Sequence, residues 1–190
     1  MNTINDQDTL KNGNMKKRNF ILFLPLLIAL AFFFFAPVIQ RQMAKRNSNL
    51  SVYTKPLPAV TDAAKMYIDH LQISDFKSNE YSLHGWGFLT HFQELTPTEY
   101  ERTLLLISDA KIFSLSTSEV IRTDVQKAFQ DLDLDLTYSG FNTSFSLYAL
   151  PPDKYLIAMV FSLTDGTEFL FYSDFVLNRT VNSLKLIQVQ

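Results

Sequence analysis

Apolar residues follow two different patterns along the chain, and the change falls near residue 60. Residues 20–39 contain no charged side chain, and a helix of that length spans about 30 Å, the thickness of the hydrocarbon core of a membrane. Beyond residue 60, apolar residues instead form short runs that alternate with polar residues, as in strands with one buried face. These patterns predict a transmembrane α-helix over residues 19–39 and an all-β domain over residues 61–190.

The predicted strands are short and regularly spaced. Asp165 and Gly166 form a strong two-residue hairpin signal, and Asp109 and Ala110 separate two further apolar runs. The segments with strand character are 66–73, for which a short helix from Ala63 is the alternative, 81–92, 102–108, 111–117, 141–150, 155–163, 168–177 and 183–189. Seven or eight strands separated by turns predict an antiparallel β-sandwich of immunoglobulin-like type, without the Cys-Trp-Cys signature of antibody domains.

One of these segments, residues 81–92, combines bulky aromatic residues with glycine. Alternation places Trp86 and Phe88 on one face of the strand and Gly85 and Gly87 on the other. Glycine within a strand indicates a bulge or a close approach of two backbones. Trp86 fits two interpretations, an aromatic residue that packs in the core or a platform for a sugar ring.

The residues around the predicted helix indicate its orientation. Four basic residues precede it and three follow it, and this slight excess predicts that residues 1–18 remain in the cytoplasm and that the β domain lies outside it. Residues 40–60 are polar, basic and contain two prolines, which predicts a juxtamembrane stalk. A cleaved signal peptide is the alternative, with small residues at 29–31, although cleavage there would leave the apolar stub "FFFFAPVI".

Charge and composition narrow the classes of function. The segment 1–60 carries a net charge of +6 and the segment 61–190 a net charge of −8. An acidic domain is a poor partner for nucleic acid, which favours a basic surface. The chain has no cysteine, so it can form neither a disulfide framework nor a thiolate metal site.

The stretch "DLDLDL" is the one that most resembles a ligand site. Asp131, Asp133 and Asp135 alternate with leucines, and such a run can hold a calcium ion or form a strand with one wet face. An EF-hand loop requires glycine at its sixth position and glutamate at its twelfth. Those positions hold Leu136 and Asn142, so a strand is the better prediction and a weak calcium site the alternative.

Other candidate residues carry no catalytic signature. Arg122 and Asp124 are candidates for ligand binding or for bracing the loop before Val125, and Tyr148 and Tyr172 are candidates for sugar contacts. His70, His84 and His91 have no metal-ligand spacing, and the chain contains no G-x-S-x-G, G-x-G-x-x-G or phosphate-loop motif. The sequence therefore predicts a protein without catalytic or cofactor-binding residues.

Four short motifs occur in a characteristic order, namely "HGWGF", "VIRTDVQKAF", "SGF" and "PPDKY". In this order they resemble the β-sandwich modules of bacterial envelope proteins, of the kind associated with enzymes that assemble surface polysaccharide. The resemblance covers roughly residues 66–177 and implies an accessory protein of the cell membrane, because the chain contains no glycosyltransferase-like portion. The expected partners are the lipid bilayer and an envelope enzyme or glycan. A carbohydrate-binding or adhesin-like module and an unrecognised envelope hydrolase are the alternatives.

Overall fold

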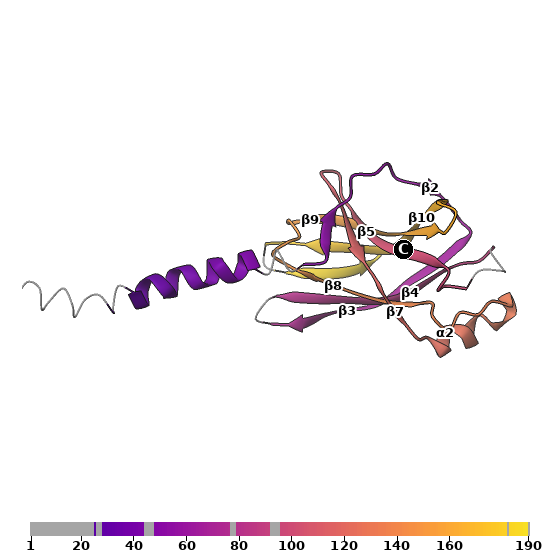
Figure 1. Ribbon diagram of the computed structural model, residues 1–190, viewed down its shortest axis with the longest axis horizontal. Helices are drawn as coiled ribbons and strands as arrows, with labels where there is room; N and C mark the ends of the chain where they lie inside the picture. Colours follow the sequence, from indigo (N-terminus) through magenta and orange to yellow (C-terminus); the bar gives the residue numbers. More distant parts are fainter. Residues whose placement is uncertain are drawn as a thin grey trace, which may run out of the picture. The chain divides into compact units, whose positions relative to one another are not determined.

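The computed structural model describes residues 25, 28–43, 48–76, 79–91, 96–181 and 183–189 (Figure 1). The chain divides into two compact units, Met1–Met43 and Ala44–Gln190. The second unit, called the β body below, contains the strands, and each unit is described by itself.

The described residues of the first unit, 25 and 28–43, are α-helical. Its apolar side chains are exposed, and those of the four consecutive phenylalanines from Phe32 to Phe35 are between 63% and 77% exposed. Residues 19–24, 26 and 27 of the predicted transmembrane helix lie outside the described residues. Among the described residues, none of the helices has both the length and the apolarity that a membrane span requires.

The β body is built from two sheets that pack face to face, as the sequence predicts for a β-sandwich. The larger sheet has the strand order β1-β6-β5-β9-β10-β11 with β2 beside β10, and the smaller has the order β3-β4-β8-β7. Figure 1 shows β5, β9 and β10 in one layer and β3, β4 and β7 in the other. The bounds are β1 (Leu50–Val52), β2 (Ala59–Val60), β3 (Ala64–Asp75), β4 (Glu80–Leu89), β5 (Tyr100–Ile107), β6 (Ile112–Ser116), β7 (Ser118–Val120), β8 (Gly140–Ser146), β9 (Asp153–Leu163), β10 (Glu168–Arg179) and β11 (Leu184–Gln188).

The main core lies between the two sheets. Alternate residues of β5, Leu104 and Leu106, belong to it together with Leu83 of β4 and Phe145 of β8. The strand β9 is central in the larger sheet, since it pairs with β5 on one side and β10 on the other. Leu104 and Leu106 share one face of β5 because side chains alternate between the two faces along a strand.

The two predicted hairpins are present. β5 and β6 pair antiparallel on either side of Asp109 and Ala110, and β9 and β10 pair on either side of Asp165 and Gly166. Gly166 has φ of 87°, a conformation that side chains other than glycine rarely adopt. The segment after Ala63 is strand β3, and the alternative prediction of a helix there is wrong.

The predicted stalk differs from the structure. Two of its segments, β1 and β2, belong to the larger sheet: β1 pairs antiparallel with β6, and β2 pairs parallel with β10. Tyr53, which lies between them, packs against a second apolar cluster that contains Leu105, Val160 and Leu170. The segment from Leu50 to Val60 therefore covers the outer face of the larger sheet. A domain that began at residue 61, as predicted, would leave this apolar face exposed.

The "DLDLDL" stretch is not a strand, so that prediction is wrong. It follows a short helix α2 (Thr123–Ala128) and begins within a 3₁₀ helix, Gln130–Leu132. Asp133 then takes up a left-handed conformation with φ of 52°, and this turn breaks the extended pattern. Leu134 and Leu136 are nevertheless buried, in a cluster with Phe88 and Val125, and the aspartates face outward. The alternation reported which side chains are buried but not the backbone conformation.

The predicted close backbone approach at Gly85 is present. A Cβ atom on Gly85 would lie 2.3 Å from the carbonyl oxygen of Tyr67 and 2.7 Å from the ring of Phe141. The pairing of β3 with β4 also shifts register between Ile68 and His70. Glycine is needed here because no side chain fits between the backbone of β3 and the ring of Phe141.

Candidate functional site

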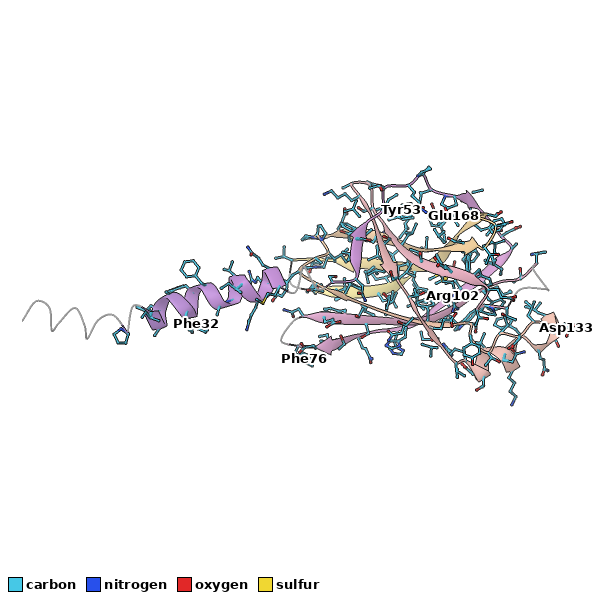
Figure 2. All side chains as sticks on the ribbon, viewed as in Figure 1. Phe32, Tyr53, Phe76, Arg102, Asp133 and Glu168 are labelled. Carbon is cyan, nitrogen blue, oxygen red and sulfur yellow. The ribbon has the colours of Figure 1, made fainter. Side chains whose placement is uncertain are left out.

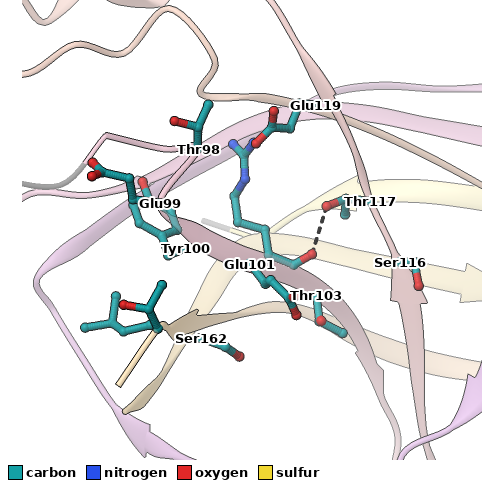
Figure 3. Close-up of a pocket in the computed structure, with 12 residues that line it drawn as sticks. Thr98, Glu99, Tyr100, Glu101, Thr103, Ser116, Thr117, Glu119 and Ser162 are labelled. Atoms are coloured by element: carbon teal, nitrogen blue, oxygen red, sulfur yellow. Dashed lines mark hydrogen bonds and ion pairs between the residues drawn. The ribbon is translucent and has the colours of Figure 1, made fainter. Parts of the chain in front are cut away.

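An open cleft of about 710 Å³ lies at one end of the β body, where the chain crosses from the larger sheet to the smaller. Figure 3 shows Thr117 and Glu119 on one side of the cleft and Ser162 toward the other. The cleft, called the Arg102 cleft below, is lined by Thr98, Glu99, Tyr100, Glu101, Arg102, Thr103, Ser116, Thr117, Glu119, Ser162, Leu163 and Thr164.

Arg102 is the buried cation at the base of this cleft. It occupies an inward position of β5, two residues before the core residue Leu104, and is only 6% exposed. Its Nη1 atom donates to the carbonyl oxygens of Gly87 at 3.2 Å and Ser139 at 2.7 Å, and its Nη2 atom donates to that of Tyr138 at 2.9 Å. Figure 2 shows Arg102 between the two layers. The side chain therefore connects the larger sheet to the smaller one through three backbone acceptors.

The surroundings of Arg102 determine its charge state. Burial lowers the pKa of the guanidinium, and Tyr100 and Glu119 act in the opposite direction. Glu119 approaches Nη2 at 3.6 Å, and its side chain is half exposed. Arginine stays protonated in proteins despite such burial. The cleft therefore contains a cation whose N–H groups already donate hydrogen bonds to backbone carbonyl oxygens.

The remaining lining residues make the cleft acidic and rich in hydroxyl groups. Three glutamates line it, whereas Arg102 is the one cation among the lining residues that the structure describes. Glu99 accepts hydrogen bonds from the backbone N–H of Thr96 at 2.6 Å and from its hydroxyl at 3.0 Å. An acidic cleft repels anions, and its carboxylates and hydroxyls can accept hydrogen bonds from hydroxyl or ammonium groups. The cleft is therefore suited to a neutral polyhydroxylated or a cationic group.

Arg122 and Asp124, two of the predicted binding residues, do come together. Arg122 Nε and Nη2 donate to the two carboxylate oxygens of Asp124 at 2.8 and 2.6 Å, and Nη1 donates to Asp69 of β3. Hydrogen bonding to Arg122 lowers the pKa of Asp124 to about 2 and raises that of Arg122. Since Arg122 immediately precedes α2, the pair braces this loop against β3, as one of the two interpretations predicted.

The other predicted site residues are dispersed. Tyr148 follows β8, where its hydroxyl accepts a hydrogen bond from Asn79, and Tyr172 lies in the middle of β10. Neither lines the Arg102 cleft. Asp135 accepts a hydrogen bond from the backbone N–H of Thr137. Within the described ranges, no group of three or more His, Asp or Glu side chains is placed to hold a metal ion, so Asp131, Asp133 and Asp135 are not brought together.

Trp86 lies beside the core. Its ring stacks on Tyr67, with centroids 6.1 Å apart, and also contacts Phe88 and Phe129. It packs against the cluster that α2 and the "DLDLDL" leucines complete. These contacts fit the interpretation of Trp86 as a packing residue.

The sequence did not point to a pair of stacked histidines. His70 of β3 and His84 of β4 are directly opposite each other, with ring centroids 4.5 Å apart and an interplanar angle of 18°. Burial and the neighbouring His70 lower the pKa of His84, while Asp69 acts in the opposite direction. The register shift between Ile68 and His70 brings the rings together, and no sequence pattern shows it.

Arg102 was also missed, although a weak signal existed. It is the one charged residue at an inward position of the apolar strand "YERTLLLI", and a charge there requires a buried partner.

Comparisons with protein-family models, with curated proteins and with solved structures found no match for this chain. The resemblance of the four short motifs to envelope modules therefore stays an expectation from the sequence. Function is argued below from the exposed helix, the β body and the chemistry of the Arg102 cleft.

Proposed function

We propose that this chain is a membrane-anchored, non-catalytic binding protein of the bacterial cell envelope. Its β body, an immunoglobulin-like sandwich outside the cytoplasm, acts as an accessory subunit in surface polysaccharide assembly. The observation that carries the proposal is the separation of the chain into an exposed apolar helix and a compact β body with its own core.

The helix supports the anchoring part of the proposal. Residues 28–39 include apolar side chains on every side, and Phe32 to Phe35 alone cover a full turn. An exposed helix that is apolar all round requires an apolar environment. Residues 20–27 continue the apolar run in the sequence, and the whole run has the length that a bilayer requires.

The Arg102 cleft supports the binding part. It is open, acidic and lined by hydroxyl groups, so it suits a hydroxyl-bearing or cationic group on a partner. The buried N–H groups of Arg102 are already bonded to carbonyl oxygens, which leaves the rim residues Glu101, Glu119 and Thr164 to contact the partner. The role of the cleft is recognition, with the helix supplying proximity to the membrane.

Membrane fractionation tests the anchor. The full chain should stay in the pellet when membranes are washed with alkaline carbonate and should be released by detergent. A matched variant in which Phe32→Ser, Phe33→Ser, Phe34→Ser and Phe35→Ser are combined should shift to the soluble fraction, since four of the apolar side chains are lost. Release of the unaltered chain by carbonate would contradict the proposal.

Site-specific crosslinking tests the accessory role. A photo-crosslinking amino acid at Thr164, on the rim of the cleft, should capture an envelope membrane protein in intact cells. The same amino acid at Val60, which is exposed but is not among the residues that line the cleft, is the control. Equal capture from both positions, or none from either, would contradict recognition through the cleft.

Carbohydrate binding is the second candidate function. The hydroxyl groups and glutamates of the cleft favour it, because sugars are recognised by dense networks of hydrogen bonds. The tyrosine that lines the cleft, Tyr100, is buried, and its hydroxyl accepts a hydrogen bond from the backbone of Leu89, so it offers no exposed ring for stacking. Binding of neutral glycans on an array, abolished by Glu119→Gln together with Glu101→Gln, would favour this function over the accessory role.

A further inference from the structure

The two most exposed large apolar side chains of the β body, among its described residues, are at the tips of hairpins. Phe76, which follows β3, is 80% exposed, and Val181, between β10 and β11, is 74% exposed. Neither side chain belongs to any of the three apolar clusters. Exposed apolar residues are common singly, so their meaning depends on where they lie.

Both tips lie at the end of the β body that contains Ser48, its first described residue, and this end is called the Ser48 end below. The hydroxyl of Ser48 accepts a hydrogen bond from the backbone N–H of Ser146 at the end of β8. The next residue, Leu147, donates its N–H to the carbonyl oxygen of Asn79, in the β3–β4 hairpin. Its own carbonyl oxygen accepts a hydrogen bond from Arg179, the last residue of β10.

These contacts connect Ser48 with both hairpins. Asn79 precedes β4 in the hairpin that carries Phe76, and Arg179 pairs with Leu184 across the turn that carries Val181. Figure 2 shows Phe76 at one end of the β body and Asp133 at the other. The residues around Ser146 and Leu147 are thus the point where the incoming chain and the two apolar tips meet.

The length of the chain limits how far this end can lie from a bilayer that holds the apolar segment. The last apolar residue of the segment is Ile39, the helix ends at residue 43, and Ser48 is already bonded within the β body. An extended chain advances by at most about 3.6 Å per residue, and a helix by about 1.5 Å, so Ser48 stays within about 25 Å of Ile39. No comparable restraint applies to the end that carries Asp133.

Charges near the Ser48 end are mixed. Lys154 of β9 and Lys185 of β11 both pair with Asn178 of β10, which places the two lysines in one row across the larger sheet. Asp75 and Glu80 pair beside Phe76. Two lysines favour anionic headgroups, whereas the two acids oppose them, so the apolar tips contribute most of the attraction to a lipid surface.

We infer that the Ser48 end docks on the surface of the lipid bilayer by inserting Phe76 and Val181 among the lipid headgroups. This inference rests on the proposed membrane anchor and deepens it. Besides the anchor, the membrane makes a second contact with the protein, and that contact fixes the orientation of the β body. The Arg102 cleft, at the other end of the strands, then faces away from the lipid.

Fluorescence quenching in nanodiscs tests the docking. The full chain carrying Phe76→Trp is incorporated into nanodiscs of phosphatidylcholine and phosphatidylglycerol, with and without brominated acyl chains. The added emission, relative to that of the unaltered chain with its Trp86, should shift to shorter wavelength and lose intensity in brominated lipid. Val181→Trp should behave in the same way, and Val60→Trp, which is 66% exposed on β2, should show neither effect.

The outcomes separate the docking from the anchor. Failure of the chain to incorporate into nanodiscs would overturn both, whereas incorporation without quenching at positions 76 and 181 would overturn the docking alone. A shift to shorter wavelength without quenching would mean that protein, such as a second copy of the chain, covers the tips, and would also overturn the docking. Quenching at both tips and not at position 60 is the supporting result.

Discussion

Arg102 on one sheet donates a hydrogen bond of 2.7 Å to the carbonyl oxygen of Ser139, in the turn that leads to the other sheet. With Gly87 and Tyr138 as further acceptors, one side chain donates hydrogen bonds to three backbone carbonyl oxygens at the end of the sandwich. The same residue forms the base of the open cleft. Fold stability and the shape of the candidate site therefore depend on one arginine.

Replacement of Arg102 by methionine should destabilise the protein by about 3 kcal/mol, because it removes three hydrogen bonds from a buried guanidinium to backbone carbonyl oxygens. Urea unfolding followed by circular dichroism measures this change. The matched control is Glu119→Gln, which removes a half-exposed partner 3.6 Å away and should cost less than about 1 kcal/mol. Equal effects of the two substitutions would show that the carbonyl contacts contribute nothing.

The two glycines of β4 should respond differently to alanine. In Gly85→Ala the new Cβ meets the backbone oxygen of Tyr67 at 2.3 Å, and relief requires movement of a strand, so we expect a loss of about 2 kcal/mol or more. In Gly87→Ala the nearest atom is the Met159 sulfur at 3.0 Å, which belongs to a flexible side chain, and the loss should be smaller. Thermal melts of both variants decide this, and the reverse order would contradict the predicted cause.

The stacked histidines should make stability depend on pH. The pKa of His84 in the folded protein is lowered from 6.5 by burial and by His70, so below pH 6.5 the unfolded chain binds more protons than the folded one. The contribution is fully present above pH 6.5 and is lost as pH falls toward the lowered folded value. His70→Gln should weaken the decline of the melting temperature between pH 7 and pH 5. His91→Gln, outside the pair, should leave it unchanged, and an identical decline in all three proteins would rule out the pair as its cause.

Substitution of the buried leucines of "DLDLDL" should destabilise the protein, whereas substitution of its exposed aspartates should not. Leu136→Ala removes a side chain that is 1% exposed and should cost about 2–5 kcal/mol. Asp133→Asn alters an exposed side chain and should change stability by less than about 0.5 kcal/mol. Millimolar calcium should not raise the melting temperature of the unaltered protein. A calcium-dependent rise that Asp133→Asn abolishes would restore the metal interpretation.

Much of the sandwich could be predicted because apolar alternation directly reports which side chains are buried. Turn residues between apolar runs located both hairpins, and alternation identified the face of β4 that carries Trp86 and Phe88. It failed at Leu134 and Leu136, where the same alternation arises from an irregular segment after a left-handed turn at Asp133. The spacing of buried side chains and the backbone conformation are separate properties, and the sequence pattern reports only the spacing.

The candidate site was harder to predict, because it depends on contacts between distant segments. Arg102 meets Gly87 and Ser139 only when the two sheets pack, and His70 meets His84 only after a register shift. Arg122 and Asp124 were found because they are neighbours in the sequence. Local pairs are visible in a sequence, whereas a cleft formed by strand ends is not.

The early strands β1 and β2 pair with partners that are made much later, and this orders the assembly of the protein. Leu50 pairs with Leu115, and Ala59 pairs with Phe169. During synthesis from the N-terminus, β1 and β2 are made first, and β2 cannot pair until β10 has been synthesised. Until then, the apolar face around Leu105 is uncovered. The segment next to the proposed anchor is therefore the first part of the β body to be made and among the last to fold.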